Sequence, residues 1–415
     1  MRKYQKYLVV SGLWLVFCGV PQWAVPQQEV LPEQNIVIGN KGQNIPVDLF
    51  DNIVYLEVLV NKKPLTFVLD TGAGDMSVID VDQANRLKLP LQNRRVVSVG
   101  AGEEVVELYD VNDITLSLPS IEFLKQSLEG LPLSKRMDPF WGKKKDGLLG
   151  GNVLSRLVTV IDYVLNRVHF YEPSTFNYFG TGEKLPFTFR GLVPVVRVKL
   201  VLPGMTEPLE GLFLVDTGAR TTTLAAPFVN EQKLLEKLPQ KINTTSGYGI
   251  GGETHGVMGR VDKMLLGGIE IKKPVLEFSQ DTKGVLANKD FSGILGADIL
   301  HRFTVVFDYS RKQMILQKNK FFDDPFEYDM SGIFLKAEGV NFNQFLVFRV
   351  LENSPAAMAG VVVGDRILAI DDNKAATLTL EEIKNIFKTD GRKVQLHIQR
   401  DETVMSVTVL LKRGI

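Results

Sequence analysis

The sequence contains one unit twice, and this duplication limits the possible folds more than any other feature. Three short motifs recur at a constant shift of 146 positions, from 70 to 216, from 147 to 293 and from 162 to 308. They are Asp-Thr-Gly-Ala in both copies, Gly-Leu-Leu-Gly matched by Gly-Ile-Leu-Gly, and Asp-Tyr in both copies. Matches that keep one register over this length indicate an internal duplication.

Each copy has the pattern of a mostly β fold. Apolar and β-branched runs at 53–59 and 65–69 flank a turn at 61–64, and the second copy has similar runs at 193–202 and 211–215. A short helix is expected after the Gly-Leu-Leu-Gly motif and after the Gly-Ile-Leu-Gly motif, with Asn152 and Asp298 as its N-caps. The copies predict two lobes, which cover residues 35–175 and 180–320.

After Asp323 the pattern changes to that of a small α+β domain, which we place at 325–415. Ser354-Pro355 is typical of a helix start, and Thr379 with Glu382 forms a capping-box pattern for a second helix. The expected strands of this domain are 345–351, 366–370, 394–398 and 404–410.

Charge argues against a nucleic-acid-binding protein, because Lys plus Arg equal Asp plus Glu at 48 each and the sequence has no basic stripe. No cofactor or metal is expected either. The four histidines, which do not have metal-ligand spacing, are His169, His255, His301 and His397. The Ser-centred elbow, zinc and phosphate-loop motifs are all missing.

The N-terminus has the layout of a secretory signal at 1–24. Basic residues at 2, 3 and 6 precede an apolar run at 7–20, and Pro21 ends it. Cleavage near Ala24 and retention as an uncleaved membrane anchor both stay open. The sole cysteine, Cys18, lies inside this run and excludes an internal disulfide in the mature chain. We expect an exported protein that is periplasmic, secreted or associated with the cell envelope.

The aspartate of the repeated Asp-Thr-Gly-Ala motif is the candidate catalytic residue in each copy. Asp70 and Asp216 each follow a buried-type strand and precede a glycine, Gly72 or Gly218, after an intervening threonine. Pseudo-twofold packing brings the two acids face to face, where they share one proton and titrate as a coupled pair. One carboxylate then takes a proton from water while the other donates to the carbonyl of a peptide bond.

These motifs resemble those of the aspartic peptidases, specifically the retropepsin-like branch. Asp-Thr-Gly-Ala is followed seven residues after the acid by Ser77 or Thr223. The second motif of that family is apolar-apolar-Gly-x-Asn/Asp, and it is present at 148–152 and 294–298. The resemblance implies two β-barrel lobes related by a pseudo-twofold axis and an aspartic endopeptidase that acts on protein or peptide substrates.

The resemblance also implies roles for matched residues. Thr71 and Thr217 would hydrogen-bond across the axis and join the catalytic loops. Glycine-tipped hairpins would cover the substrate as flaps, and Tyr248 is either a substrate contact or an exposed turn residue. The flap candidates are Gly100, Gly102, Tyr248, Gly249 and Gly251. Ala73 and Ala219 stand where acid-adapted relatives often place a hydroxyl, so we expect a working pH between mildly acidic and neutral.

The C-terminal domain resembles a PDZ domain of the bacterial, circularly permuted kind. The matching segments are 331–334, 350–357 and 364–368. By this resemblance a C-terminal peptide would add a strand, with its carboxylate at the loop and its side chains against a helix near 380–387. The loop residues are Ser331, Gly332, Ile333 and Phe334. The alternative is a domain that only packs against the peptidase.

Two further readings of the whole chain stay open: an inactive peptide-binding protein of this fold, and a PDZ-based scaffold. Retention of both aspartates with their Thr and Gly neighbours disfavours them. The oligomeric state is open too, and a membrane contact is expected only through an uncleaved N-terminal segment. The sequence leaves the substrate, self-processing, and activation or restraint by the PDZ domain undetermined.

Overall fold

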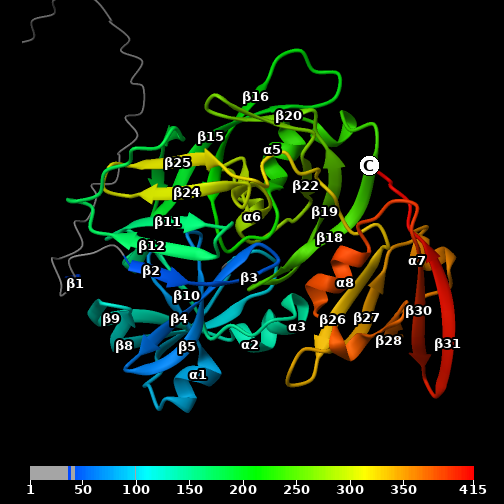
Figure 1. Cartoon of the computed structure of the whole chain (residues 1–415), viewed down its shortest axis with the longest axis horizontal. Helices are drawn as coiled ribbons and strands as arrows, with labels where there is room; N and C mark the ends of the chain where they lie inside the picture. The colour runs from blue at the N-terminus through cyan, green and yellow to red at the C-terminus, as the bar shows by residue number, and fades with distance from the viewer. Residues whose placement is uncertain (1–35, 39–42, 99) are drawn as a thin grey trace, which may run out of the picture. The chain divides into compact units, whose positions relative to one another are not determined.

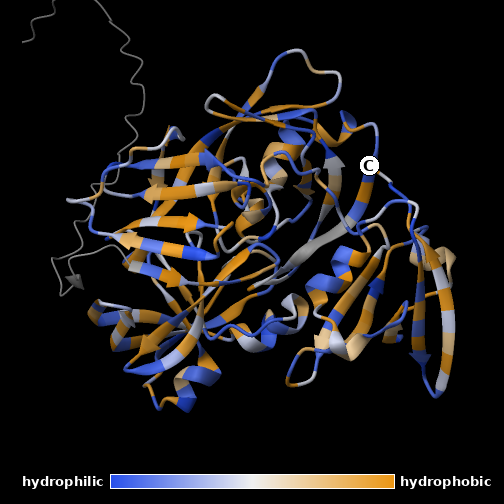
Figure 2. Ribbon diagram, viewed as in Figure 1, coloured by the Kyte–Doolittle hydropathy of each residue, from blue (hydrophilic) through white to orange (hydrophobic). Residues whose placement is uncertain are grey.

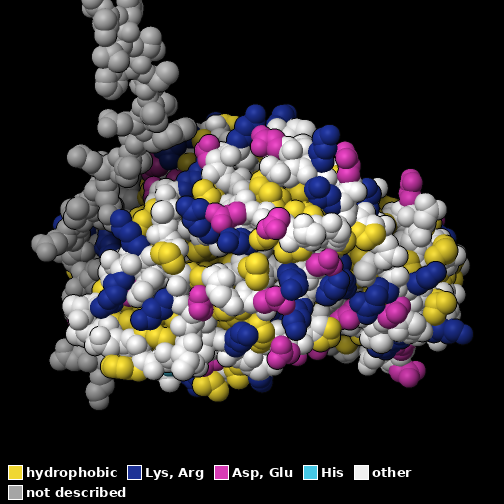
Figure 3. Space-filling view, turned by 90° about the horizontal axis from the view of Figure 1, so that it is seen from above, with side chains coloured by type: hydrophobic (Ala, Val, Ile, Leu, Met, Phe, Trp, Pro, Cys, Tyr) yellow, Lys and Arg dark blue, Asp and Glu magenta, His cyan; other side chains and the backbone are white. Residues whose placement is uncertain are grey.

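Strands dominate the computed structural model, which describes residues 36–38, 43–98 and 100–415 and confirms the mostly β fold class (Figure 1). The described strands form four sheets. The expected signal segment at 1–24 lies outside the described residues. No helix in this described part is both long and apolar enough to cross a bilayer. The face shown in Figure 3 mixes Lys and Arg with Asp and Glu, in line with the balanced composition.

The first lobe is built on one sheet that turns back on itself, because β8 pairs with both β4 and β9. Two of its pairs are parallel, β10 with β5 and β6 with β9. In sheet order the strands are β1 (Ile36–Ile38), β9 (Ile121–Leu131), β6 (Val78–Asp80), β10 (Gly147–Leu149), β5 (Lys63–Leu69), β4 (Ile53–Val60), β8 (Val106–Leu118) and β7 (Gln92–Val97), with β3 (Asp48–Phe50) beside β4. The helices are α1 (Val81–Arg86), α2 (Leu133–Arg136), α3 (Asp138–Trp141) and α4 (Gly151–Leu154).

The second lobe repeats this arrangement, with parallel pairs β16–β23 and β17–β22. Among its described strands no pairing closes the sheet, so this lobe is less barrel-like than the resemblance implied. The strands in order are β18 (Lys241–Gly249), β19 (Gly252–Arg260), β22 (Val275–Ser279), β17 (Thr223–Leu224), β23 (Gly293–Leu295), β16 (Leu209–Val215), β15 (Val193–Val201), β20 (Lys263–Leu266) and β21 (Ile269–Lys272), with β14 (Thr188–Arg190) beside β15. The helices are α5 (Ala226–Glu231), η1 (Leu234–Glu236), η2 (Val285–Ala287) and α6 (Ala297–Leu300).

A third sheet joins the lobes, because β11 of the first pairs antiparallel with β24 of the second. Val160 lies opposite Val306, its own counterpart in the repeat, so the pseudo-twofold axis passes through this pair. In order the strands are β13 (Glu183–Pro186), β25 (Gln313–Lys318), β24 (Phe303–Asp308), β11 (Val158–Asp162), β12 (Arg167–Tyr171) and β2 (Gln43–Pro46). One apolar core spans both lobes, and the strands show alternating hydropathy in Figure 2.

The C-terminal domain has a sheet with β26 at one edge. The capping box at Thr379 and Glu382 is confirmed and begins α8. The strands in order are β26 (Ile333–Glu338), β27 (Gln344–Val350), β28 (Arg366–Ile370), β30 (Lys393–Arg400) and β31 (Thr403–Leu410), with β29 (Asn373–Lys374) beside β28. The helices are α7 (Pro355–Met358), η3 (Ala375–Thr377) and α8 (Leu380–Ile386).

The predicted N-caps of the two short helices are wrong. Gly150 and Gly296 occupy the N-cap positions of α4 and α6. Asn152 Oδ1 instead accepts hydrogen bonds from the Ser77 N–H (2.8 Å) and hydroxyl (2.7 Å). Asp298 Oδ1 accepts from the hydroxyl of Thr222 at 2.7 Å. These side chains hold the loops that follow the duplicated aspartates, because both bond across the sheet, although Asp298 Oδ1 also accepts the Ile299 N–H within α6 at 2.9 Å.

Candidate active site

Asp70 and Asp216 emerge from equivalent strand ends. Asp70 follows β5 and its N–H donates to the carbonyl of Leu149 at 3.1 Å, while Asp216 follows β16 and its N–H donates to Leu295 at 3.0 Å. The parallel neighbours β10 and β23 are buried apolar strands. The backbone of each aspartate is therefore held in place by a hydrogen bond to the neighbouring buried strand.

Thr71 and Thr217 join the two loops by four reciprocal hydrogen bonds. The hydroxyl of Thr71 donates to the Val215 carbonyl and that of Thr217 donates to the Leu69 carbonyl, both at 2.7 Å. Each hydroxyl also accepts the other threonine's N–H, at 3.0 and 3.1 Å. Both threonines are buried. Four bonds across one axis fix the separation of the aspartates that precede them.

The carboxyl groups of Asp70 and Asp216 face each other closely enough to shift each other's pKa. Burial raises the pKa of both, and the facing charge of Asp216 raises that of Asp70 further. The Gly72 N–H donates to Asp70 Oδ1 at 2.9 Å, whereas Asp216 Oδ1 accepts from both Gly218 (2.8 Å) and Ala219 (3.0 Å). The pair therefore holds one proton well above the ordinary carboxyl range, and the geometry favours Asp70 as its site.

The glycine two residues after each aspartate is required, because the carboxyl group of the other lobe's aspartate lies close to it. A Cβ on Gly72 would lie 2.3 Å from the carboxyl carbon of Asp216, and a Cβ on Gly218 would lie 2.5 Å from that of Asp70. No side chain fits at either position while the two acids remain in contact.

The two loops differ by one residue, which corrects the match of Ser77 to Thr223. The Ser77 hydroxyl accepts the Gly150 N–H at 3.0 Å, and in the second lobe it is Thr222 that accepts the Gly296 N–H at 3.0 Å. The first loop therefore has one more residue before this hydroxyl. Thr223 instead donates to Glu277 Oε2 at 3.1 Å.

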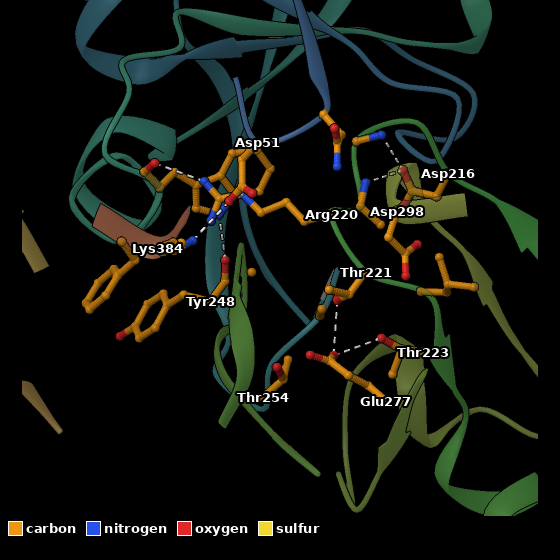
Figure 4. A pocket seen from close by; sticks show the side chains of 18 of the residues that line it. Asp51, Asp216, Arg220, Thr221, Thr223, Tyr248, Thr254, Glu277, Asp298 and Lys384 are labelled. Carbon is orange, nitrogen blue, oxygen red and sulfur yellow. Dashed lines mark hydrogen bonds and ion pairs between the residues drawn. The ribbon is translucent and has the colours of Figure 1, made fainter. Parts of the chain in front are cut away.

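A cavity of about 870 Å³ opens over the two acids and is lined by both lobes and by β26 and α8 of the C-terminal domain. Figure 4 shows Arg220 extending from the Asp216 loop toward Asp51 and Lys384. No group of three or more His, Cys, Asp or Glu in the described ranges is arranged to hold a metal ion.

The predicted flap residues meet beside this cavity, and Gly100, Tyr248 and Gly249 line it. Gly249 and Gly251 lie at the tip of the β18–β19 hairpin, and Gly100 and Gly102 lie in the loop between β7 and β8. The Gly251 N–H donates to the Ala101 carbonyl at 2.9 Å. Gly102 has φ +104° and a Cβ there would lie 2.3 Å from Gly251, so the close approach requires glycine. The two loop tips thus contact each other and contribute Gly100 and Gly249 to the cavity lining, and the first of them is an open loop and not a tight turn.

Tyr248 is held by α3 of the first lobe. Its ring stacks on Phe140 with centroids 3.6 Å apart, and its carbonyl accepts from Trp141 Nε1 at 3.0 Å. Phe140 also contacts Phe348 of β27 edge to face at 5.2 Å. On the same hairpin Glu253 forms an ion pair with Arg349 of β27 at 2.9 Å. The hairpin tip is thereby linked to the C-terminal domain.

A second link runs through Asp51. Its Oδ2 lies 3.2 Å from Arg220 Nε and 3.0 Å from Lys384 Nζ of α8. The charges of Lys384 and Arg220 hold the pKa of Asp51 well below its usual range, although burial opposes them. Arg220 also donates to the Trp141 carbonyl at 2.9 Å. The loop that follows Asp216 is therefore linked to α3 and α8 by a network of polar contacts.

The predicted peptide loop lies just before and at the start of β26. Gly332 has φ +76°, and Ser331 is buried. The N–H of Ile333 donates to the Ser331 hydroxyl at 3.0 Å, so this donor is already used within the loop. Phe334 lines the cavity, as does Lys388 after α8.

Sequence reasoning missed two carboxyl groups of the cavity, Glu129 and Glu277. They occupy equivalent places, since Glu129 pairs with Val78 in β6 and Glu277 pairs with Thr223 in β17. The sequence does contain a pattern that predicts this equivalence, because Leu-Glu occurs at 128–129 and again at 276–277. Asp51, Phe140, Trp141 and Arg220 were missed as well, and these depend on tertiary packing alone.

Comparison with known families agrees with the geometry. The family described as aspartyl protease matches residues 56–153 and again 203–299, and the family described as PDZ domain matches residues 327–411. No curated protein matches the chain.

The reciprocal threonine contact predicts a large stability effect. Replacing Thr217 by Val leaves the Leu69 carbonyl and the Thr71 N–H buried without partners, and we expect a loss of about 2–5 kcal/mol in the free energy of unfolding. Denaturant titration measures it. Thr159 is the matched control, because its buried hydroxyl lacks a partner among the described residues. Thr159→Val should change stability by less than about 1 kcal/mol, and equal losses would contradict the assignment.

Proposed function

We propose that this chain, a duplicated member of the retropepsin-like aspartyl protease family with a C-terminal PDZ domain, is an endopeptidase whose Asp70 and Asp216 activate one water molecule. This proposal depends on one observation. Two carboxyl groups with raised pKa values face each other at the base of a cavity that both of them line. A pair that holds one proton offers an acid and a base within reach of the same substrate carbonyl.

In this mechanism Asp216 is the base and Asp70 the acid. Asp216, whose charge is stabilised by the two backbone N–H groups of Gly218 and Ala219, takes a proton from water. The hydroxyl oxygen forms a bond to the peptide carbonyl carbon while Asp70 gives its proton to the carbonyl oxygen. The tetrahedral intermediate then loses its C–N bond as the nitrogen receives the proton held by Asp216, and Asp70 recovers its own.

Single substitutions test the shared pair. Asp70→Asn and Asp216→Asn should each lower peptide cleavage by about a thousandfold or more, because either change removes the acid–base partnership. The assay follows a diverse peptide mixture by mass spectrometry. Asp82→Asn, an exposed acid in α1, is the control and should retain activity. Loss in one variant alone would show that the copies do not form a common site, and absence of cleavage by wild type would favour an inactive peptide-binding protein.

The pH profile of cleavage should be bell-shaped, with its optimum between mildly acidic and neutral pH. Below the lower apparent pKa both carboxyls are protonated and no base remains, and above the upper one no acid remains. Burial and the charge of Asp216 raise the pKa of Asp70, which keeps the acid form available at higher pH. Measured kcat/KM against pH checks this, and an optimum below about pH 3 would contradict it.

For the PDZ domain we propose regulation of the flap by a C-terminal peptide. A ligand that extends β26 needs the space beside this edge strand, where α3 packs. A Cβ on Gly142, which follows α3, would lie 2.6 Å from Leu380 Cβ of α8. Since α3 also holds Tyr248, a peptide that displaces α3 frees the flap.

This role predicts activation in trans. A pool of random pentapeptides with free C-terminal carboxylates should raise kcat/KM for a reporter peptide severalfold, while the same pool with amidated ends should not. Phe140→Ala should raise the basal rate roughly two- to tenfold, because it removes the stack on Tyr248. Phe179→Ala, 93 % exposed, is the control. Competition by the carboxylate pool would favour substrate recruitment over regulation.

A further inference from the structure

Glu277 is a buried carboxyl with one oxygen left free. The side chain extends from β22, and the residue is 5 % exposed. The hydroxyls of Thr221 and Thr223 both donate to Oε2 at 3.1 Å (Figure 4). Within the described ranges no group donates to Oε1, and Glu277 lines the cavity over the two aspartates. Its carboxyl is thus oriented by two hydroxyls toward a missing partner.

The surroundings of Glu277 are electronegative. Burial raises its pKa to about 8, and the charges of Asp298 and Asp281 act in the same direction. The two threonine hydroxyls oppose this shift as donors. The ionised form of a carboxyl in such a place costs free energy unless a cation approaches it, so the group stays protonated until one does. A positively charged group that enters through the cavity is therefore the best hydrogen-bond donor for Oε1 of Glu277.

Glu129 occupies the equivalent place in the first lobe. Its N–H donates to the Ser77 carbonyl at 3.0 Å, just as the Glu277 N–H donates to the Thr222 carbonyl at 3.1 Å. Glu129 lines the same cavity, is half-buried, and has its pKa raised by burial. Because the pseudo-twofold axis passes between the two aspartates, one of these glutamates lies on each side of them.

We propose that Glu277 forms a subsite for the ammonium or guanidinium group of a lysine or arginine side chain next to the cleaved bond, and that Glu129 does so on the other side. This rests on the proposed peptidase function and names its substrate class. A cation at Oε1 gains a charge-assisted hydrogen bond in a place of low dielectric constant, and Glu277 releases its proton to solvent as the cation enters. An apolar side chain would leave the carboxyl without a partner.

The test compares matched peptides that carry Lys, Gln or Leu at the residue on either side of the cleaved bond. Wild type should prefer Lys, and Glu277→Gln should lower the Lys-to-Leu ratio of kcat/KM roughly ten- to hundredfold at one of the two sides. Glutamine keeps the size of the side chain and still accepts from the threonines, so folding should be retained. Glu207→Gln, an exposed glutamate of the same lobe, is the control and should leave the ratio unchanged.

Binding separates this inference from the proposed function. The full chain with Asp70→Asn, titrated with the same peptides by calorimetry, should still prefer Lys over Leu, and adding Glu277→Gln should abolish that preference. Preferential binding with no cleavage by wild type would overturn the peptidase and leave the subsite standing. Cleavage that depends on Asp70 but shows a Lys-to-Leu ratio unaffected by Glu277→Gln would overturn the subsite, as would equal binding of Lys and Leu peptides to the Asp70→Asn chain.

Discussion

The reciprocal bonding of Thr71 and Thr217 is the constraint on which the rest of the site depends. Two carboxyl groups in contact repel each other once both are charged, so something must hold them together. The threonine hydroxyls do this by binding the carbonyl of the residue before the opposite aspartate. The interlobe sheet centred on Val160 and Val306 supplies the wider support. Burial is the main cause of the raised pKa of both acids, and the enforced closeness of Asp216 raises the pKa of Asp70 further.

Much of this could be predicted because it is local or repeated. The strands ending at the two aspartates, the duplicated motifs and the capping box at Thr379 follow from residue pattern alone. The roles of Asn152 and Asp298 could not be predicted, because a polar residue near a helix start can bond either along the helix or across to another strand. Only the folded sheet decides between these partners, and it places Ser77 and Thr222 within reach.

The link between the protease lobes and the PDZ domain could not be predicted for a different reason. Phe140 and Trp141 belong to a short helix with no motif, and Asp51 lies in a turn. Their importance comes from partners far away in the chain, Tyr248, Phe348 and Lys384. One apolar cluster runs from Trp141 through Leu380 to the interior of the PDZ domain. The PDZ domain and the loops that line the cavity are therefore joined by one continuous set of packed side chains.

The one-residue difference between the two loops has a consequence for how a peptide lies in the site. Two identical halves would accept an extended peptide equally well in either chain direction. Here the second loop provides Arg220, which contacts Asp51 and Trp141, while the longer first loop has Gly74 and Asp75 in this stretch. The two halves therefore offer different surroundings to the amino and carboxyl sides of an extended peptide in the cavity, so its two chain directions are not equivalent there, as they would be in a symmetric site.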